Sequence, residues 1–212
     1  MAEKKTKLKK FTKEWYQYIW DYYKAHILVS IAVVLLAAFL IADMADNIKY
    51  DMNVNYIATD VIPQETSEKL SLMCAENSED LNKNGKVDIA INQLNFTEDN
   101  MASGEMYKGM LDKLMILFNS TDELVFVVDK EMLPRFVEIK YTQDIFYKAS
   151  EWFGETELSE DGYSVSLKES TALNELGLNT ENLYVLVAKT DDEDGFKPEE
   201  ENAISIAKFL LK

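Results

Sequence analysis

Residues 27–42 read ILVSIAVVLLAAFLIA, a run without a single charged side chain. With Ala25 and His26 before it, the run is long enough to cross a bilayer core of about 30 Å as one helix. It separates two parts of opposite charge, because residues 1–26 carry a net charge of +4 and the rest of the chain carries −20, for a total of −16. The run therefore predicts a short basic part, one apolar helix and a long acidic part.

The flanks of this run predict how the helix lies in a membrane. Aromatic side chains, which prefer the headgroup level of a bilayer, gather just before it: Trp15, Tyr16, Tyr18, Trp20, Tyr22 and Tyr23. Lysines further upstream provide the positive-inside signal, whereas Asp43 and Asp46 follow the run. We therefore expect a basic, aromatic-rich cytoplasmic tail (1–24), a transmembrane helix (25–44) and an extracytoplasmic domain (47–212). This organisation describes a single-pass protein of the cell membrane, with the lipid bilayer as a partner.

Two other interpretations of the run stay open. A cleavable signal peptide also joins basic residues to an apolar run, although Ala42 and Ala45 do not have Ala-x-Ala spacing and no lipobox cysteine follows. A buried helix of a soluble protein is the second interpretation, although Ser30 is the only polar side chain in the run.

The acidic part shows strands alternating with helices. The expected strands are 52–58, 86–94, 124–128 and 183–188, and the expected helices are 63–77, 101–119 and 198–212. Two of these strands are continuous apolar runs, the pattern of a strand covered on both faces. The alternation predicts an α/β fold, a three-layer-like domain with a partly parallel sheet. Between residues 130 and 182 a helix near 152–154 and an edge strand at 163–167 are indicated, and their order stays open.

One segment has the composition of a metal-binding loop. Residues 80–88 read DLNKNGKVD, which fits the first nine positions of a calcium loop. The expected ligands are the side-chain oxygens of Asp80, Asn82 and Asn84, the carbonyl of Lys86 and the carboxylate of Asp88. Ile91 stands at the twelfth position, where an EF-hand needs a bidentate Glu, so a conventional EF-hand is excluded. An Asx-rich turn without an ion is the alternative, because Asp, Asn and Gly are common turn residues.

The loop resembles the calcium loop of bacterial periplasmic galactose-binding proteins, in which a helix leads through a similar run into a strand. The resemblance implies a structural calcium whose shell is completed by a Glu distant in sequence. It covers nine residues, and Asn84 replaces the usual Asp, which removes one negative charge. The loop is also similar to dockerin loops, which need an acid at the twelfth position. The layout of lysine-rich tail, aromatic belt, span and loop resembles uncharacterised single-pass membrane-anchored proteins of Gram-positive bacteria, and this likeness implies no activity.

Several chemistries are disfavoured by composition. His26 is the only histidine and precedes the apolar run, so the acidic domain has no histidine for catalytic triads, ordinary zinc sites or acid/base work. Nucleotide-binding glycine motifs and GxSxG are missing from the sequence. A domain of charge −20 repels phosphate backbones, so we expect no nucleic-acid partner. Cys74 has no second cysteine to pair with and is expected to be a packed apolar residue.

Polar residues that follow the expected strands are candidates for the rim of a ligand cleft. They are Asp60, Asn95, Asp129 and Thr190, because ligands of α/β sheets gather beyond the carboxyl ends of strands. The alternative is that they cap helices and form turns. Residues 191–194 form a second acidic loop that is expected to be an exposed charge run.

Together these observations predict a membrane-tethered extracytoplasmic binding or accessory module, non-catalytic and stabilised by calcium. Its partner would be an extracellular ligand or another membrane protein. Two other functions stay open: a carboxylate-based hydrolase of wall polymer or glycan, which needs two carboxyls in one cleft, and a structural subunit of a membrane complex, which needs an exposed apolar patch.

Overall fold

The computed structural model describes residues 11–45, 49–134, 145–154, 161–190 and 195–212. The chain forms two compact units, Met1–Ile48 and Lys49–Lys212, each described by itself.

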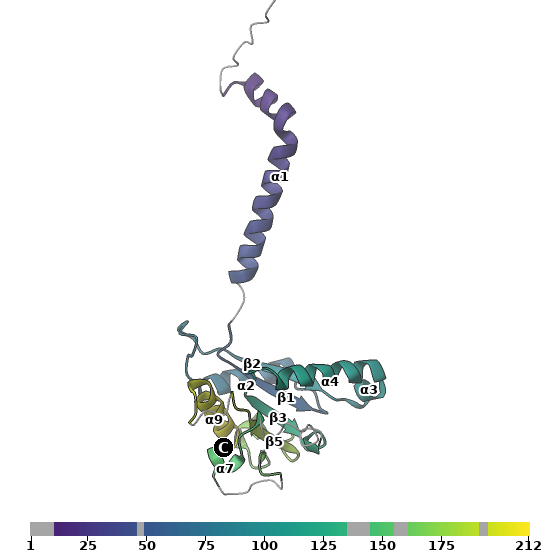
Figure 1. The fold of residues 1–212 in the computed structure, drawn as a ribbon, viewed down its shortest axis with the longest axis vertical. Coiled ribbons are helices and arrows are strands. Elements are labelled where there is room, and N and C mark those ends of the chain that lie inside the picture. The colour runs from purple at the N-terminus through teal and green to yellow at the C-terminus, as the bar shows by residue number, and fades with distance from the viewer. Residues whose placement is uncertain (1–10, 46–48, 135–144, 155–160, 191–194) are drawn as a thin grey trace, which may run out of the picture. The chain divides into compact units, whose positions relative to one another are not determined.

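The first unit contains one long helix, α1 (Lys13–Ala45) (Figure 1). A stretch of 18 residues within Trp15–Leu40 has a mean hydropathy of 2.1, and none of this stretch is buried within the chain. By length and composition the helix can cross a membrane. A core helix of a soluble domain would be mostly covered by its own chain, so the absence of burial argues against that interpretation. A signal sequence near the N-terminus can also contain a helix that is long and apolar enough, so that interpretation stays open.

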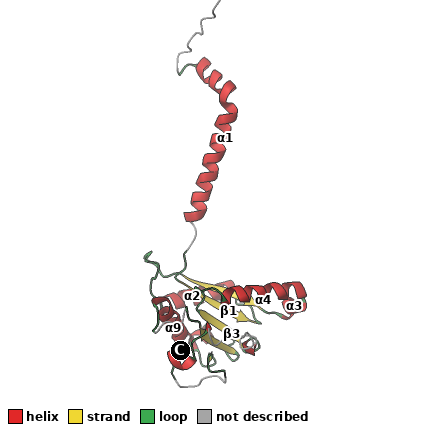
Figure 2. Ribbon diagram, in the orientation of Figure 1, coloured by secondary structure: helices red, strands yellow, loops and turns green. Residues whose placement is uncertain are grey.

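The second unit is built on one five-stranded sheet (Figure 2). Its strands are β1 (Met52–Ala58), β2 (Ile89–Asn95), β3 (Val125–Asp129), β4 (Val165–Ser166) and β5 (Leu183–Val187). They lie in the order β2-β1-β3-β5-β4. β1 pairs in parallel with both β2 and β3, whereas β5 pairs antiparallel with β3 and with β4. The expected α/β fold with a partly parallel sheet is confirmed.

Helices connect and cover these strands (Figure 1). They are α2 (Gln64–Ala75), α3 (Glu98–Ala102), α4 (Gly104–Phe118), α7 (Ala149–Trp152), α8 (Thr171–Glu175) and α9 (Pro198–Leu210). The prediction of one helix over 101–119 was wrong in one respect. The backbone of Ser103 is extended (φ −85°, ψ 102°) and separates α3 from α4. Between residues 130 and 182, the described residues form α7, then β4, then α8.

The hydrophobic core surrounds strands β1 and β3. Val125, Phe126, Val127 and Val128 of β3 are at most 1% exposed, which confirms a strand covered on both faces. Three aromatic rings, those of Phe118, Phe126 and Phe146, pack together with centroids 5.4 to 5.9 Å apart. Helix α9 packs against β5, β3 and β1. The sheet is therefore held by hydrophobic burial around β1 and β3.

Asn55 of β1 is a polar residue inside this core. Asn55 of β1 is fully buried, and its amide nitrogen donates to Glu123 Oε2 at 2.7 Å. The other oxygen of Glu123 accepts a 3.0 Å hydrogen bond from Asn53. Glu123 precedes β3, so the hydrogen bonds tie the turn before β3 to the neighbouring strand. Buried polar groups are tolerated where they are hydrogen-bonded in this way.

We predict that Phe126→Ala lowers the free energy of unfolding by about 3–5 kcal/mol, because the substitution leaves a cavity beside Phe118 and Phe146. Urea unfolding followed by circular dichroism measures this loss. Ile116→Ala on the exposed face of α4, where Ile116 is 68% exposed, is the control and should change stability by no more than about 0.5 kcal/mol. Equal losses in the two variants would contradict the assignment of the core to this aromatic group.

Candidate functional site

The loop of residues 80–88 lies between α2 and β2. Both carboxylate oxygens of Asp80 accept backbone hydrogen bonds, Oδ2 from Gly85 N–H at 2.8 Å and Oδ1 from Asn84 N–H at 3.2 Å. Gly85 has φ +87°, a conformation in which a side chain would be strained. Lys83 also has a positive φ, of +57°. The loop is therefore a tight turn closed over the Asp80 side chain.

The two asparagines of the loop continue this pattern. Asn82 Oδ1 accepts from Asn84 N–H at 3.0 Å, and Asn84 Oδ1 accepts from Lys86 N–H at 2.8 Å. Each side chain thus binds the backbone two residues further on, which is the Asx-turn geometry. The alternate positions of Asp80, Asn82 and Asn84 serve the turn itself, whether or not an ion is bound.

A residue outside the loop, Asp51, holds it in place, and sequence reasoning missed this residue. Asp51 Oδ1 accepts from Asn82 N–H and Oδ2 from Asp88 N–H, both at 2.9 Å. Its own N–H donates to the Asp88 carbonyl at 2.8 Å. Asp51 immediately precedes β1 and pairs with the residue that precedes β2. No local pattern marks it, because its role follows from the parallel register of two strands.

The donors of this loop match calcium in kind. Calcium prefers carboxylate, amide and carbonyl oxygens, and Asp80, Asp88, the two asparagines and Lys86 offer all three. Within the described ranges, no group of three or more His, Cys, Asp or Glu side chains could hold a metal ion. The distant Glu that the resemblance implies is thus not found among the described residues. A site with two carboxylates would bind calcium weakly, since affinity follows ligand charge.

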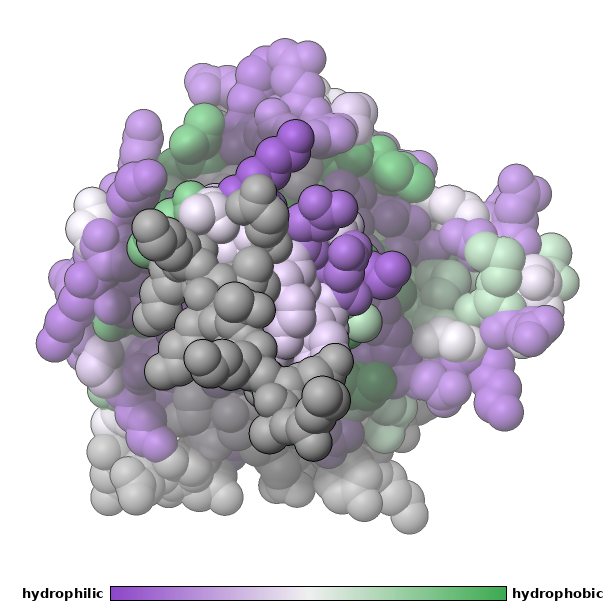
Figure 3. Space-filling model, turned by 90° about the horizontal axis from the view of Figure 1, so that it is seen from above, coloured by the Kyte–Doolittle hydropathy of each residue, from purple (hydrophilic) through white to green (hydrophobic). Residues whose placement is uncertain are grey.

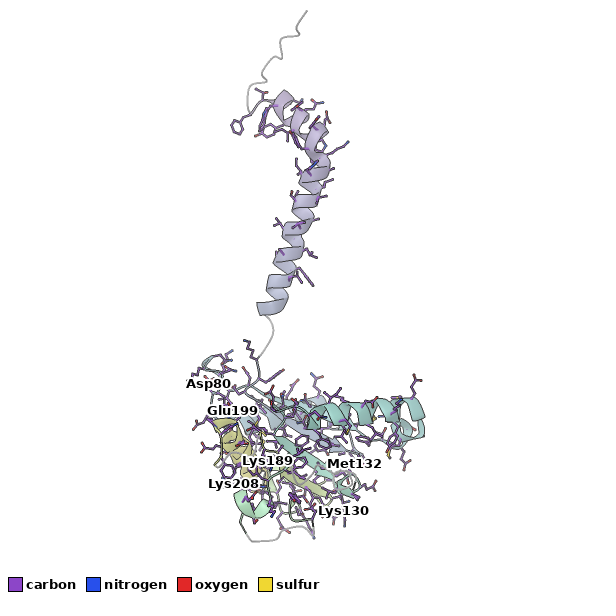
Figure 4. All side chains as sticks on the ribbon, viewed as in Figure 1. Asp80, Lys130, Met132, Lys189, Glu199 and Lys208 are labelled. Atoms are coloured by element: carbon purple, nitrogen blue, oxygen red, sulfur yellow. The ribbon has the colours of Figure 1, made fainter. Side chains whose placement is uncertain are left out.

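Three of the four expected cleft residues meet at one edge of the sheet. Because β1, β2 and β3 are parallel, Asp60, Asn95 and Asp129 all lie at their carboxyl ends. Asn95 Nδ2 donates to the Asp60 carbonyl at 2.6 Å. Asp129 accepts from Thr59 Oγ1 at 2.9 Å. In Figure 4, Asp80 and Lys130, the residue after Asp129, lie on opposite sides of the domain, so this edge and the loop of residues 80–88 are separate sites.

A buried tyrosine accompanies this carboxyl edge. Tyr56 of β1 is 4% exposed, and burial raises its pKa to about 12, with further contributions from the negative charges of Asp60 and Asp129. A phenol with this pKa keeps its proton at neutral pH. Tyr56 can therefore donate a hydrogen bond at this edge and cannot act as a base.

Thr190 does not join the other three residues. It follows β5, which runs antiparallel to β3, so it lies toward the opposite edge of the sheet. Its N–H and Oγ1 both donate to Glu200 Oε1, at 2.7 and 2.9 Å. This position corrects the expectation of a common cleft rim, because strand direction decides which ends meet.

Glu200 also lies at this edge of the sheet, and sequence reasoning did not single it out. It is 1% exposed, and its Oε2 accepts from Lys197 N–H at 2.8 Å. Burial would raise its pKa, but the hydrogen bonds from Lys197, Thr190 and Tyr147 outweigh burial and lower the pKa. A Glu at the third position of a helix that begins with Pro198 is a capping-box signal, which could have marked it. Glu200 thus joins Thr190 and Lys197 at the start of α9.

Cys74 is fully buried in the core. Burial raises the pKa of its thiol to about 12, so the thiol is not a nucleophile at neutral pH.

No family model, no curated protein and no solved structure matches the chain.

We predict that the stability contribution of Glu200 depends on pH. Since its pKa is lowered in the folded state, the contribution is present above the ordinary carboxyl pKa of 4.5 and is lost as pH falls below that value. Glu200→Gln should therefore cost about 1–3 kcal/mol at pH 7 and less at pH 3, as measured by urea unfolding at both pH values. Glu199→Gln, at an exposed neighbour, is the matched control. A cost that does not change with pH would contradict the role of the carboxylate charge.

Proposed function

We propose that the chain is a membrane-tethered recognition or accessory module, non-catalytic, with its folded domain outside the cell. The observation that carries this proposal is α1, an apolar helix of which none is buried by its own chain, joined to a compact domain with its own core. An apolar surface of this length is stable in water only if something covers it, and a bilayer does so.

The flanks of α1 support the orientation. Tyr16, Trp20 and Tyr22 are 56%, 53% and 69% exposed along the first turns of the helix. Rings that are exposed next to an apolar span fit the interface of a bilayer. The lysines of the tail favour the cytoplasmic side, and the domain with its acidic charge then lies outside.

The hydrogen bonds of the polar groups at the carboxyl edge support a non-catalytic role. Both oxygens of Asp129 accept hydrogen bonds from its own neighbourhood, one from Thr59 Oγ1 and one from Glu131 N–H. The Asn95 amide is likewise bound to the loop after β1. A hydrolase would need two carboxyls that face a substrate, whereas these groups hold turns. Among the coloured residues of Figure 3, hydrophilic ones predominate.

The proposal includes a three-layer arrangement and a structural calcium. Connections between parallel strands are almost always right-handed. The chain moves from β1 to β2 through α2, and back past β1 to β3 through α4, so right-handed connections would place α2 and α4 on opposite faces of the sheet. Calcium at residues 80–88 would join the end of α2 to β2 through Asp80, Asn82, Asn84, Lys86 and Asp88.

The orientation is tested by cysteine labelling in intact cells. Cys74 is fully buried, so the wild-type chain provides a low background for a membrane-impermeant maleimide. We predict that Thr121→Cys, at an exposed turn, reacts in intact cells, and that Thr6→Cys in the tail reacts only after permeabilisation. The reverse pattern would refute the orientation. Loss of the residues before the domain from the mature protein would indicate a signal peptide.

Calcium binding is tested by thermal unfolding of the full chain in detergent, with calcium, with magnesium or with chelator. Calcium at about ten times its dissociation constant should stabilise the folded state by about 1.4 kcal/mol, which raises the midpoint by about 3–5 °C. The increment should be specific to calcium and disappear in Asp80→Ala. Asp112→Ala, at an exposed position of α4, is the control that should keep it. An unchanged midpoint at millimolar calcium would refute the calcium site and leave an Asx turn.

A further inference from the structure

Helix α1 is longer than a bilayer is thick. It contains 33 residues, and at about 1.5 Å per residue it is about 50 Å long. A bilayer has an apolar core of about 30 Å and measures about 40–45 Å with both headgroup layers. The uncharged residues between Lys24 and Asp43 are enough to fill the apolar core. The first turns of α1, residues 13–24, therefore lie beyond that core.

An upright placement would lift part of these turns out of the membrane. At about 1.5 Å per residue, Trp15 would stand about 15 Å beyond Ala25, whereas each headgroup layer is only about 5–8 Å thick. Trp15 and Tyr16 would then face water, although aromatic rings prefer the headgroup level. The first turns of α1 fit the headgroup layer only if they lie along it.

The same turns have a polar stripe. Lys13, Gln17, Asp21 and Lys24 follow one another at intervals of four, four and three residues, so they fall within about 80° of the helix circumference. All four side chains are exposed. Most of the remaining circumference carries aromatic rings, those of Trp15, Tyr16, Tyr18, Trp20, Tyr22 and Tyr23. A helix with one polar and one apolar face is suited to lie in the plane of a membrane surface.

The structure shows where this segment begins and how its rings are arranged. Trp15 N–H donates to Thr12 Oγ1 at 3.4 Å, which is an N-cap contact. The ring centroid of Phe11 lies 5.4 Å from that of Trp15, and the rings of Tyr18 and Tyr22 are stacked at 5.9 Å. In Figure 1, the first turns of α1 lean away from the axis of the apolar part of the helix. One continuous helix can thus lie on a surface at its start and cross the bilayer with the remainder.

We propose that residues 13–24 form a surface helix, which lies along the cytoplasmic headgroup layer with its polar stripe toward water and its rings among the lipids. Its partner is the phospholipid surface itself, because the surface helix is continuous with the span. The net charge of +4 on residues 1–26 complements the phosphates of anionic lipids. This inference rests on the proposed membrane tether and adds the arrangement of its cytoplasmic end.

The arrangement is tested by spin labels on the full chain in vesicles of phosphatidylcholine and phosphatidylglycerol. Cys74 is fully buried, so it provides a low background. Four variants carry one label each: Gln17→Cys and Asp21→Cys on the polar stripe, and Ile19→Cys and Tyr23→Cys on the opposite side of the helix. Collisions of each label with a water-soluble nickel complex and with oxygen dissolved in the bilayer give its depth.

A surface helix predicts depths that alternate along the chain. The labels at residues 19 and 23 should lie about 5–10 Å deeper than those at residues 17 and 21. An upright helix would instead give depths that increase steadily from residue 17 to residue 23, by about 3 Å for every two residues.

A steady increase in depth would overturn the proposal, and so would equal exposure of all four labels to the nickel complex. Val34→Cys, within the apolar part of α1, is the control for the tether itself. Its label should lie near the centre of the bilayer whether the first turns are flat or upright. A label at residue 34 that meets the nickel complex would mean that the tether fails, so failure of the surface helix and failure of the tether are distinguishable.

Discussion

The antiparallel pairing of β5 with β3 is the constraint that decides which polar groups of this domain can meet. Strands β1, β2 and β3 run in one direction, so the residues that follow them collect at one edge. β5 runs the other way and returns the chain to the opposite edge, where Thr190 meets Glu200. Helix α9 begins there and packs back over β5, β3 and β1.

Strand β3 is buried at the centre of the sheet, so polar groups beside it must be hydrogen-bonded within the domain. β3 has neighbours on both sides and side chains covered on both faces, so its backbone groups are satisfied within the ladder. Asn55 is tolerated beside it because its amide nitrogen donates to Glu123 and to the Val125 carbonyl, and its amide oxygen accepts from Asn92. At the carboxyl edge, Asp129 and Asn95 similarly bind neighbouring loops. These polar groups are explained by the stability of turns.

The segment that follows α2 is tied to two other parts of the domain. The loop after α2 is held by Asp51, the residue that precedes β1, through hydrogen bonds to Asn82 and Asp88. Glu79, just before that loop, is joined to Asn202 of α9.

The sequence by itself determined the apolar helix, the bounds of β1, the burial of β3 and the start of α9 at Pro198, because periodicity, apolar content and capping residues act locally. It misjudged the helix over 101–119, because the helical spacing of the apolar residues was given more weight than the Ser103-Gly104 pair, a local signal for a helix start. Only the tertiary structure decided the direction of β5, and with it the separation of Thr190 from Asp129. The role of Asp51 was also found only there. Both features depend on contacts between segments distant in sequence, whereas a local pattern can show that a strand is buried but not which way its neighbour runs.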